Sequence, residues 1–108
     1  GDPMFQIDAF AELASIIKAK SNKNIWCYTG YTFEQLLRNN KSLELLKNID
    51  VLVDGRFIEE QKDKEILFRG SKNQRLIDVQ QSLKLGEIVT YQPIGLLSPL
   101  LMKYKIHA

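Results

Sequence analysis

The chain has 108 residues, enough for one modest domain, and 44% of them are apolar, so a core can form. The 15 Lys and Arg against 13 Asp and Glu leave a net charge of +2, too weak and interspersed to indicate nucleic-acid binding. One cysteine and one histidine exclude an intrachain disulfide and cannot by themselves complete a tetrahedral zinc site or hold an iron–sulfur cluster. No apolar run reaches about 18 residues, so we expect no membrane span. No charged-then-apolar stretch with a cleavage site precedes the rest of the sequence, so we expect no secretory leader.

The first predicted elements are a helix and a strand. After a turn at Gly1–Pro3, Asp8 is placed to cap a helix whose apolar residues recur at helical spacing as far as Lys20. The next apolar run, Ile25–Thr29, consists of strand formers and is stopped by Gly30.

Two short helices and a second strand are predicted next. Thr32 opens a helix, with Gln35 three residues on in a capping-box arrangement, and Ser42–Lys47 favours another helix. The run Ile49–Val53 is continuously apolar, which is typical of a strand buried on both faces in a parallel sheet, and Asp54-Gly55 ends it.

The second half is less regular. Phe57–Lys64 is a charged helix or loop, and Ile66–Phe68 is a third apolar piece. Periodicity leaves Leu76–Leu83 open as a strand or a short helix, and the alternation in Gly86–Tyr91 predicts a last strand. The alternation of helices and strands indicates an α/β fold.

The end of the chain differs from the rest. Residues 93–102 are strongly apolar but are interrupted by two prolines and a glycine. They could pack against the domain, bind a partner, or lie exposed where other parts of a protein are missing. We therefore divide the chain into a domain over residues 1–92 and a tail of unknown role over residues 93–108.

Glycines and polar residues gather just after the apolar runs, at Thr29-Gly30, Asp54-Gly55 and Arg69-Gly70-Ser71. Ligands bind at the carboxyl ends of strands in parallel α/β folds, so these positions are candidates for a site. Each glycine could instead simply make a turn. Arg69 and Arg75 flank a polar stretch that could bind an anion or carboxylate, or form a solvated turn. Cys27, within an apolar strand, is expected to be a packing residue.

Three blocks carry a resemblance to a known family. They are Ile25–Tyr31 (IWCYTGY), Ile49–Phe57 (IDVLVDGRF) and Phe68–Val79 (FRGSKNQRLIDV). In this order and spacing they resemble the activating proteins of anaerobic ribonucleoside-triphosphate reductases. The similarity runs from residue 1 to about residue 91.

The resemblance implies a radical S-adenosylmethionine enzyme, with a mostly parallel sheet in a partial, open β/α barrel. It implies a [4Fe–4S] cluster on three cysteines of a CxxxCxxC loop, with S-adenosylmethionine on the fourth iron site. One electron then releases a 5′-deoxyadenosyl radical, which takes a hydrogen from a glycine of the partner reductase. The hard chemistry belongs to the cofactors. An electron donor such as a flavodoxin, and an anaerobic cytoplasm, complete the expected setting.

This sequence departs from the family pattern in one decisive way, because the CxxxCxxC loop is absent. Gly1-Asp2-Pro3 resembles the end of the family's GGDP motif, and the chain begins with Gly rather than Met. We expect the chain to be the C-terminal part of an activating protein, inactive by itself and without a cluster. A vector-derived Gly-Asp-Pro before Met4 is the lesser alternative.

The resemblance also assigns residues to a cofactor wall. The motif ending at Pro3 would meet the amino group of S-adenosylmethionine, the two strand ends would lie beside the cofactor, and the late RGSxNQ block would contact cofactor or partner. No catalytic or metal residue is expected in this chain. The cofactor-binding candidates are Gly1, Asp2, Pro3, Tyr28, Thr29, Gly30, Asp54, Gly55, Arg69, Gly70, Ser71, Asn73 and Gln74.

Two other functions stay open. The first is a non-catalytic α/β docking module derived from the same family, favoured by the apolar tail. The second is a small nucleotide-binding domain, which is weaker because neither GxxxxGK[ST] nor GxGxxG occurs in the sequence.

Overall fold

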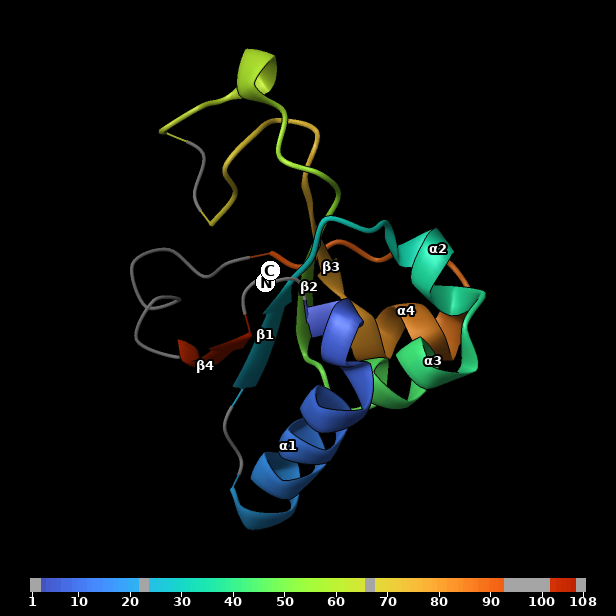
Figure 1. The fold of residues 1–108 in the computed structure, drawn as a ribbon. Helices are drawn as coiled ribbons and strands as arrows, with labels where there is room; N and C mark the ends of the chain where they lie inside the picture. Colours follow the sequence, from blue (N-terminus) through green and yellow to red (C-terminus); the bar gives the residue numbers. More distant parts are fainter. Residues whose placement is uncertain (1–2, 22–23, 66–67, 93–101, 107–108) are drawn as a thin grey trace.

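The computed structural model describes residues 3–21, 24–65, 68–92 and 102–106 (Figure 1). These residues form four α-helices, two 3-10 helices and four strands. In chain order they are η1 (Pro3–Gln6), α1 (Ile7–Lys20), β1 (Asn24–Tyr28), α2 (Phe33–Leu37), α3 (Asn40–Leu46), β2 (Val51–Asp54), η2 (Glu59–Gln61), β3 (Arg75–Asp78), α4 (Val79–Leu85) and β4 (Met102–Ile106).

The strands form one sheet in the order β3-β2-β1-β4. β1 runs parallel to both β2 and β4, and Cys27 lies opposite Leu52. β3 is antiparallel to β2, with Arg75 opposite Asp54. The α/β class is therefore confirmed, and two of the three strand pairings are parallel.

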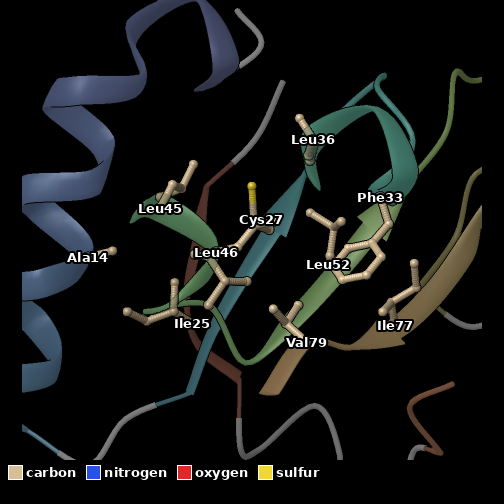
Figure 2. Close-up of a cluster of buried hydrophobic side chains, with 11 residues drawn as sticks. Ala14, Ile25, Cys27, Phe33, Leu36, Leu45, Leu46, Leu52, Ile77 and Val79 are labelled. Atoms are coloured by element: carbon tan, nitrogen blue, oxygen red, sulfur yellow. The ribbon is translucent and has the colours of Figure 1, made fainter. Parts of the chain in front are cut away.

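The four α-helices pack on one face of the sheet (Figure 1). Side chains alternate across a strand, so Ile25, Cys27 and Leu52 point to this face and join one buried cluster. Figure 2 shows them beside Ala14 of α1 and Leu45 of α3. The intervening residues Trp26, Val51 and Val53 form a second buried cluster on the opposite face, against Tyr28, Phe68, Leu76 and Tyr91.

The helix starts follow the local sequence with one exception. The capping box at α2 is confirmed: Thr32 Oγ1 accepts from the Gln35 N–H at 3.2 Å, and Gln35 Oε1 accepts from the Thr32 N–H at 2.8 Å. The expected cap at Asp8 is wrong. α1 has Gln6 at its N-cap with no side-chain cap, and Asp8 lies in its first turn. The reason is that the chain already turns helically through η1, so α1 begins before Asp8 can cap it.

The ambiguous stretch Leu76–Leu83 holds both elements, the end of a strand and then a helix. Asp78 ends β3 and caps α4, since its side chain accepts from the Gln81 N–H at 3.1 Å. Gly86 ends α4 in the left-handed conformation, with φ of 72°. The strand predicted over Gly86–Tyr91 is reduced to one isolated bridge between Thr90 and Ile77.

The tail lies partly outside the described residues, which include none of 93–101. Residues 102–106 pair with β1 as the edge strand β4, which the sequence did not predict. The division at residue 92 stays a prediction. Among the described residues, no helix combines the length and the apolarity needed to cross a membrane.

Candidate functional site

The predicted polar segments meet at one edge of the sheet. β1 and β2 are parallel, so their carboxyl ends lie together, and the Thr29 N–H donates to the Val53 carbonyl at 3.1 Å. β3 is antiparallel to β2, so its beginning lies at the same edge. The segment before β3, which includes Arg69 and Gln74, is thereby brought to the strand ends although it follows no strand in the described residues.

Asp54 is the most buried charge at this edge, with its residue 1% exposed. Its Oδ2 accepts from the Phe33 N–H at 2.8 Å, and its Oδ1 accepts from Arg75 Nε at 3.0 Å. Arg75 also donates to Asp54 Oδ2 at 2.5 Å and to Glu34 at 2.6 Å. Asp54 thus joins β2 to the start of α2 and to β3.

These contacts shift the pKa values of Arg75 and Glu34. The hydrogen bonds that Arg75 donates to Asp54, which have the larger effect, and to Glu34 raise the pKa of Arg75 above its ordinary value. The hydrogen bond from Arg75 lowers the pKa of Glu34. Arg75 therefore binds carboxylates, as its residue type allows, but the carboxylates are those of this chain.

Gln74 holds together the long connection between β2 and β3. Its Oε1 accepts from the Gly70 N–H at 2.9 Å and from the Ser71 N–H at 3.1 Å. Its Nε2 donates to the Gly55 carbonyl at 2.9 Å. Its own carbonyl accepts from Arg69 at 2.8 Å.

Asn73 and Ser71 add a second set of bonds in the same loop. Asn73 Nδ2 donates to the Arg56 carbonyl at 2.7 Å, and Ser71 Oγ donates to Asn73 Oδ1 at 2.6 Å. Ser71 Oγ also accepts from the Ile58 N–H at 3.2 Å. Asn73 and Ser71 therefore bond to the loop itself and fix its conformation.

The geometry of this loop favours glycine at both positions. Gly55 has φ of 94°, a left-handed conformation that side chains rarely adopt. At Gly70 a Cβ would lie 3.0 Å from the ring of Phe57, closer than ordinary contact. These glycines therefore serve the conformation of the loop itself, whether or not they also contact a ligand.

The other predicted site residues are placed as follows. Thr29 is buried and its Oγ1 accepts from the Tyr31 N–H at 3.2 Å, while Gly30 is exposed at the edge. Tyr28 lies on the face away from the helices, and burial raises its pKa. Pro3 begins η1, whereas Gly1 and Asp2 lie outside the described residues.

A cavity of about 300 Å³ opens beside this edge. It lies between the N-terminal segment and the starts of α2 and α3, and its lining includes Met4, Tyr31, Gln35 and Lys41. Met4, the residue after Pro3, and Tyr31, the residue after Gly30, thus line the same cavity.

The residues present do not fit an iron–sulfur cluster. Cys27, the one cysteine of the sequence, is buried in the core on the helix-covered face. Among the described residues, no three His, Cys, Asp or Glu side chains are grouped so that they could hold a metal ion.

Comparison with known proteins now identifies the family. The profile of the 4Fe-4S single cluster domain matches residues 1–77. The chain belongs to this family. Its relatives include anaerobic ribonucleoside-triphosphate reductase-activating proteins, and the resemblance seen in the three sequence blocks is confirmed. No solved structure gives a significant match.

Three of these relatives define the extent of the match. The Vibrio cholerae protein is 44% identical over 77 residues, and the Haemophilus influenzae protein is 38% identical over 77 residues; each match covers 68% of this chain and 48% of the relative. The protein of phage T4 is 42% identical over 79 residues, covering 70% of this chain and 47% of the relative. The chain thus spans about half the length of these relatives.

Three residues of interest were missed by the sequence analysis. Glu34 is a second partner of Arg75, and only the folded chain brings together positions 41 residues apart. Phe68 has φ of 70°, which nothing in its sequence predicts. Trp26 is buried with its indole N–H unpaired among the described residues, which residue spacing cannot reveal.

Proposed function

We propose that this chain is the C-terminal part of an activating enzyme for anaerobic ribonucleoside-triphosphate reductase. The complete enzyme would be of the radical S-adenosylmethionine type, would hold a [4Fe–4S] cluster, and would place a glycyl radical on the reductase in the cytoplasm. The observation that carries the proposal is the family match over residues 1–77 in a chain that spans half of its relatives.

Within that enzyme, we assign this chain to one wall of a partial β/α barrel. Its parallel strands β1 and β2 would present Thr29-Gly30 and Asp54-Gly55 toward the cofactor. The cluster requires cysteines that lie outside this sequence, since Cys27 is the only one here and is buried in the core. We therefore route no chemical step through residues of this chain.

The internal bonding of the wall refines the roles of its residues. The Asp54 carboxylate is already bound by Arg75 and by the Phe33 N–H, so Asp54 would position the strand end rather than bind ligand. Gln74 would likewise hold the loop. Contact with S-adenosylmethionine would then fall to the exposed backbone at Gly30 and to the N-terminal Gly1–Pro3.

The proposal is tested first on the natural protein. We expect its coding sequence to contain a CxxxCxxC loop before Gly1, and its intact mass to match that longer chain. With reduced cluster, S-adenosylmethionine and reductase, that protein should generate the paramagnetic signal of a glycyl radical. A natural protein that begins at Gly1, or a longer one without radical-forming activity, would overturn the proposal.

An apolar cavity supports the second candidate, a docking module. It measures about 230 Å³ and lies between α2, α4 and the segment that follows α4. Its lining includes Leu37, Leu83 and Ile88, of which Leu37 is 39% exposed. A natural protein without a cluster loop that still bound the reductase would favour this function over the first.

A further inference from the structure

The cavity of about 300 Å³ beside the N-terminal segment contains a nearly buried hydroxyl group. It belongs to Ser42 of α3, which lines the cavity and is 4% exposed. Among the residues that the structure describes, this hydroxyl makes no hydrogen bond. In the same part of the chain, Trp26 Nε1 is the side-chain polar atom that is both unpartnered and sealed from solvent. The Ser42 hydroxyl is therefore not sealed, and the cavity that it lines gives access to it.

The two side-chain amides of the lining have already used their acceptor oxygens. Gln35 Oε1 accepts from the Thr32 N–H at 2.8 Å. Asn39 Oδ1 accepts from the N–H groups of Lys41 and Ser42, at 2.8 Å and 3.2 Å. Neither amide NH₂ group donates to a residue that the structure describes. The capping of α2 and α3 thus leaves the donor side of both amides for a ligand.

Lys41 supplies the one charge among the described residues that line the cavity. Its ammonium group meets the Asp8 carboxylate at 3.4 Å, and the two side chains are 68% and 78% exposed. Such an exposed ion pair is screened by solvent and contributes little to stability. Lys41 can therefore turn toward an anion in the cavity with little loss.

This combination of groups selects the charge and the size of a ligand. A lining with available donors, a positive charge and engaged amide acceptors fits an oxyanion, which accepts hydrogen bonds and donates none. The apolar side chains of Met4, Ile7 and Leu36 complete the lining and suit a short hydrocarbon part. The volume lies at the lower end of the range for ligand pockets, so the ligand should be small.

We propose that this cavity binds a small organic anion. Its carboxylate or phosphate group would be bound by the Ser42 hydroxyl, the Lys41 ammonium group and the Asn39 amide NH₂. Its hydrocarbon part would lie against Met4 and Leu36. The inference goes beyond the proposed function, because every residue of the site belongs to this chain and none of them needs a cluster.

The test is a titration of the natural protein, labelled with 15N and followed by its backbone amide signals at constant ionic strength. Butyrate and propyl phosphate present the two oxyanions on a short hydrocarbon chain, and butyramide is the neutral control. We expect saturable shifts at residues 39–42 with at least one of the two anions, and the tighter one names the preferred group. Absence of saturable binding by both anions, or equal binding of butyramide, would overturn the inference.

Three variants test the residues of the site. Ser42→Ala should weaken anion binding about tenfold, because a hydrogen bond to a charged group is lost. The fold should be kept, since the hydroxyl has no partner in the chain and alanine favours a helix. Lys41→Gln should also weaken binding, whereas Lys47→Gln is the matched control, which removes the same charge at the other end of α3. Unchanged affinity in folded Ser42→Ala, or equal weakening in Lys47→Gln and Lys41→Gln, would contradict the site.

The failure of this inference is distinguishable from the failure of the proposed function. Displacement of the anion by S-adenosylmethionine would assign these donors to the cofactor, which overturns the inference and leaves the proposed function intact. Binding by residues 1–108 alone, but not by a longer natural protein, would mean that the rest of the protein fills the cavity, and would overturn it too. Saturable anion binding by a natural protein that forms no glycyl radical would support the site while the proposed function fails.

Discussion

Asp54 is almost wholly buried, and Arg75 balances its charge with two hydrogen bonds. Removing one partner of a buried ion pair leaves an uncompensated charge, which typically costs 3–5 kcal/mol. Arg75 is 35% exposed at its side chain, so we place Arg75→Met at the lower end, about 3 kcal/mol less stable. Urea unfolding followed by circular dichroism measures the change.

Two further variants test whether the loss of stability in Arg75→Met comes from the Asp54 carboxylate that is left buried without its partner. Asp54→Asn, added to Arg75→Met, should recover part of the stability because no charge is then buried. Glu34→Gln should cost less than about 1 kcal/mol, since the Glu34 side chain is 51% exposed. Equal losses from Glu34→Gln and Arg75→Met would contradict this account.

Tyr28 makes the free energy of unfolding depend on pH in the alkaline range. Burial raises its pKa in the folded chain above the ordinary value of 10.0, so the unfolded chain ionises first. The stability that this difference contributes is present below pH 10 and is lost as the pH rises through the folded pKa. Tyr28→Phe should therefore lose less stability between pH 9 and pH 11 than the parent, measured by urea midpoints at each pH. An unchanged slope in the variant would refute the assignment.

At the scale of elements, α2 depends on its capping box because the helix is only five residues long. Thr32→Ala leaves the Gln35 N–H without its acceptor and should destabilise the chain by about 1 kcal/mol. Thr32→Ser keeps the hydroxyl and is the matched control, with little change expected. Thermal unfolding of both variants decides the matter, and an equal loss in Thr32→Ser would show that packing, not capping, matters.

The connection between β2 and β3 should loosen as a unit when Gln74 is changed. Gln74→Ala removes its acceptor for Gly70 and Ser71 and its donor for Gly55, while the sheet pairing of β1 with β2 is untouched. Hydrogen exchange should therefore speed up over residues 56–65 and 68–74 and stay slow in β1. Gln74→Glu keeps the acceptor but loses the donor. Its exchange rates in the loop should lie between those of the parent and of Gln74→Ala. If exchange in β1 sped up as much as exchange in the loop, the β2–β3 connection would not open independently of the sheet.

Some of these elements could be predicted from the sequence and others could not. The capping box and the buried strand β2 follow from local residue types, and both are confirmed. The direction of β3 could not be predicted, because periodicity says nothing about which way a strand runs. The partners of Arg75 were missed for the same reason: Asp54 and Glu34 come close only once β3 has reversed against β2.

At the scale of the whole molecule, one sheet face is covered by the four α-helices, whereas the other carries no helix among the residues that the structure describes. The polar side chains at the sheet edge largely bond to one another, as Asp54 with Arg75 and Ser71 with Asn73 do. The result is a wall whose shape is fixed from within. In the function that we propose, this wall would position a cofactor only together with the groups that hold the cofactor.

The cluster is the clearest case of this dependence. Three thiolates are needed to hold a [4Fe–4S] cluster with one open iron, and this sequence offers only the buried Cys27. After anaerobic reconstitution with iron and sulfide, we expect this chain to bind no stoichiometric cluster, by iron analysis and visible absorption. The full-length protein treated in parallel should bind one. A stable, stoichiometric cluster on the chain alone, lost in Cys27→Ser, would mean that the core opens to expose that thiol and that the assignment of the cluster to residues elsewhere is wrong.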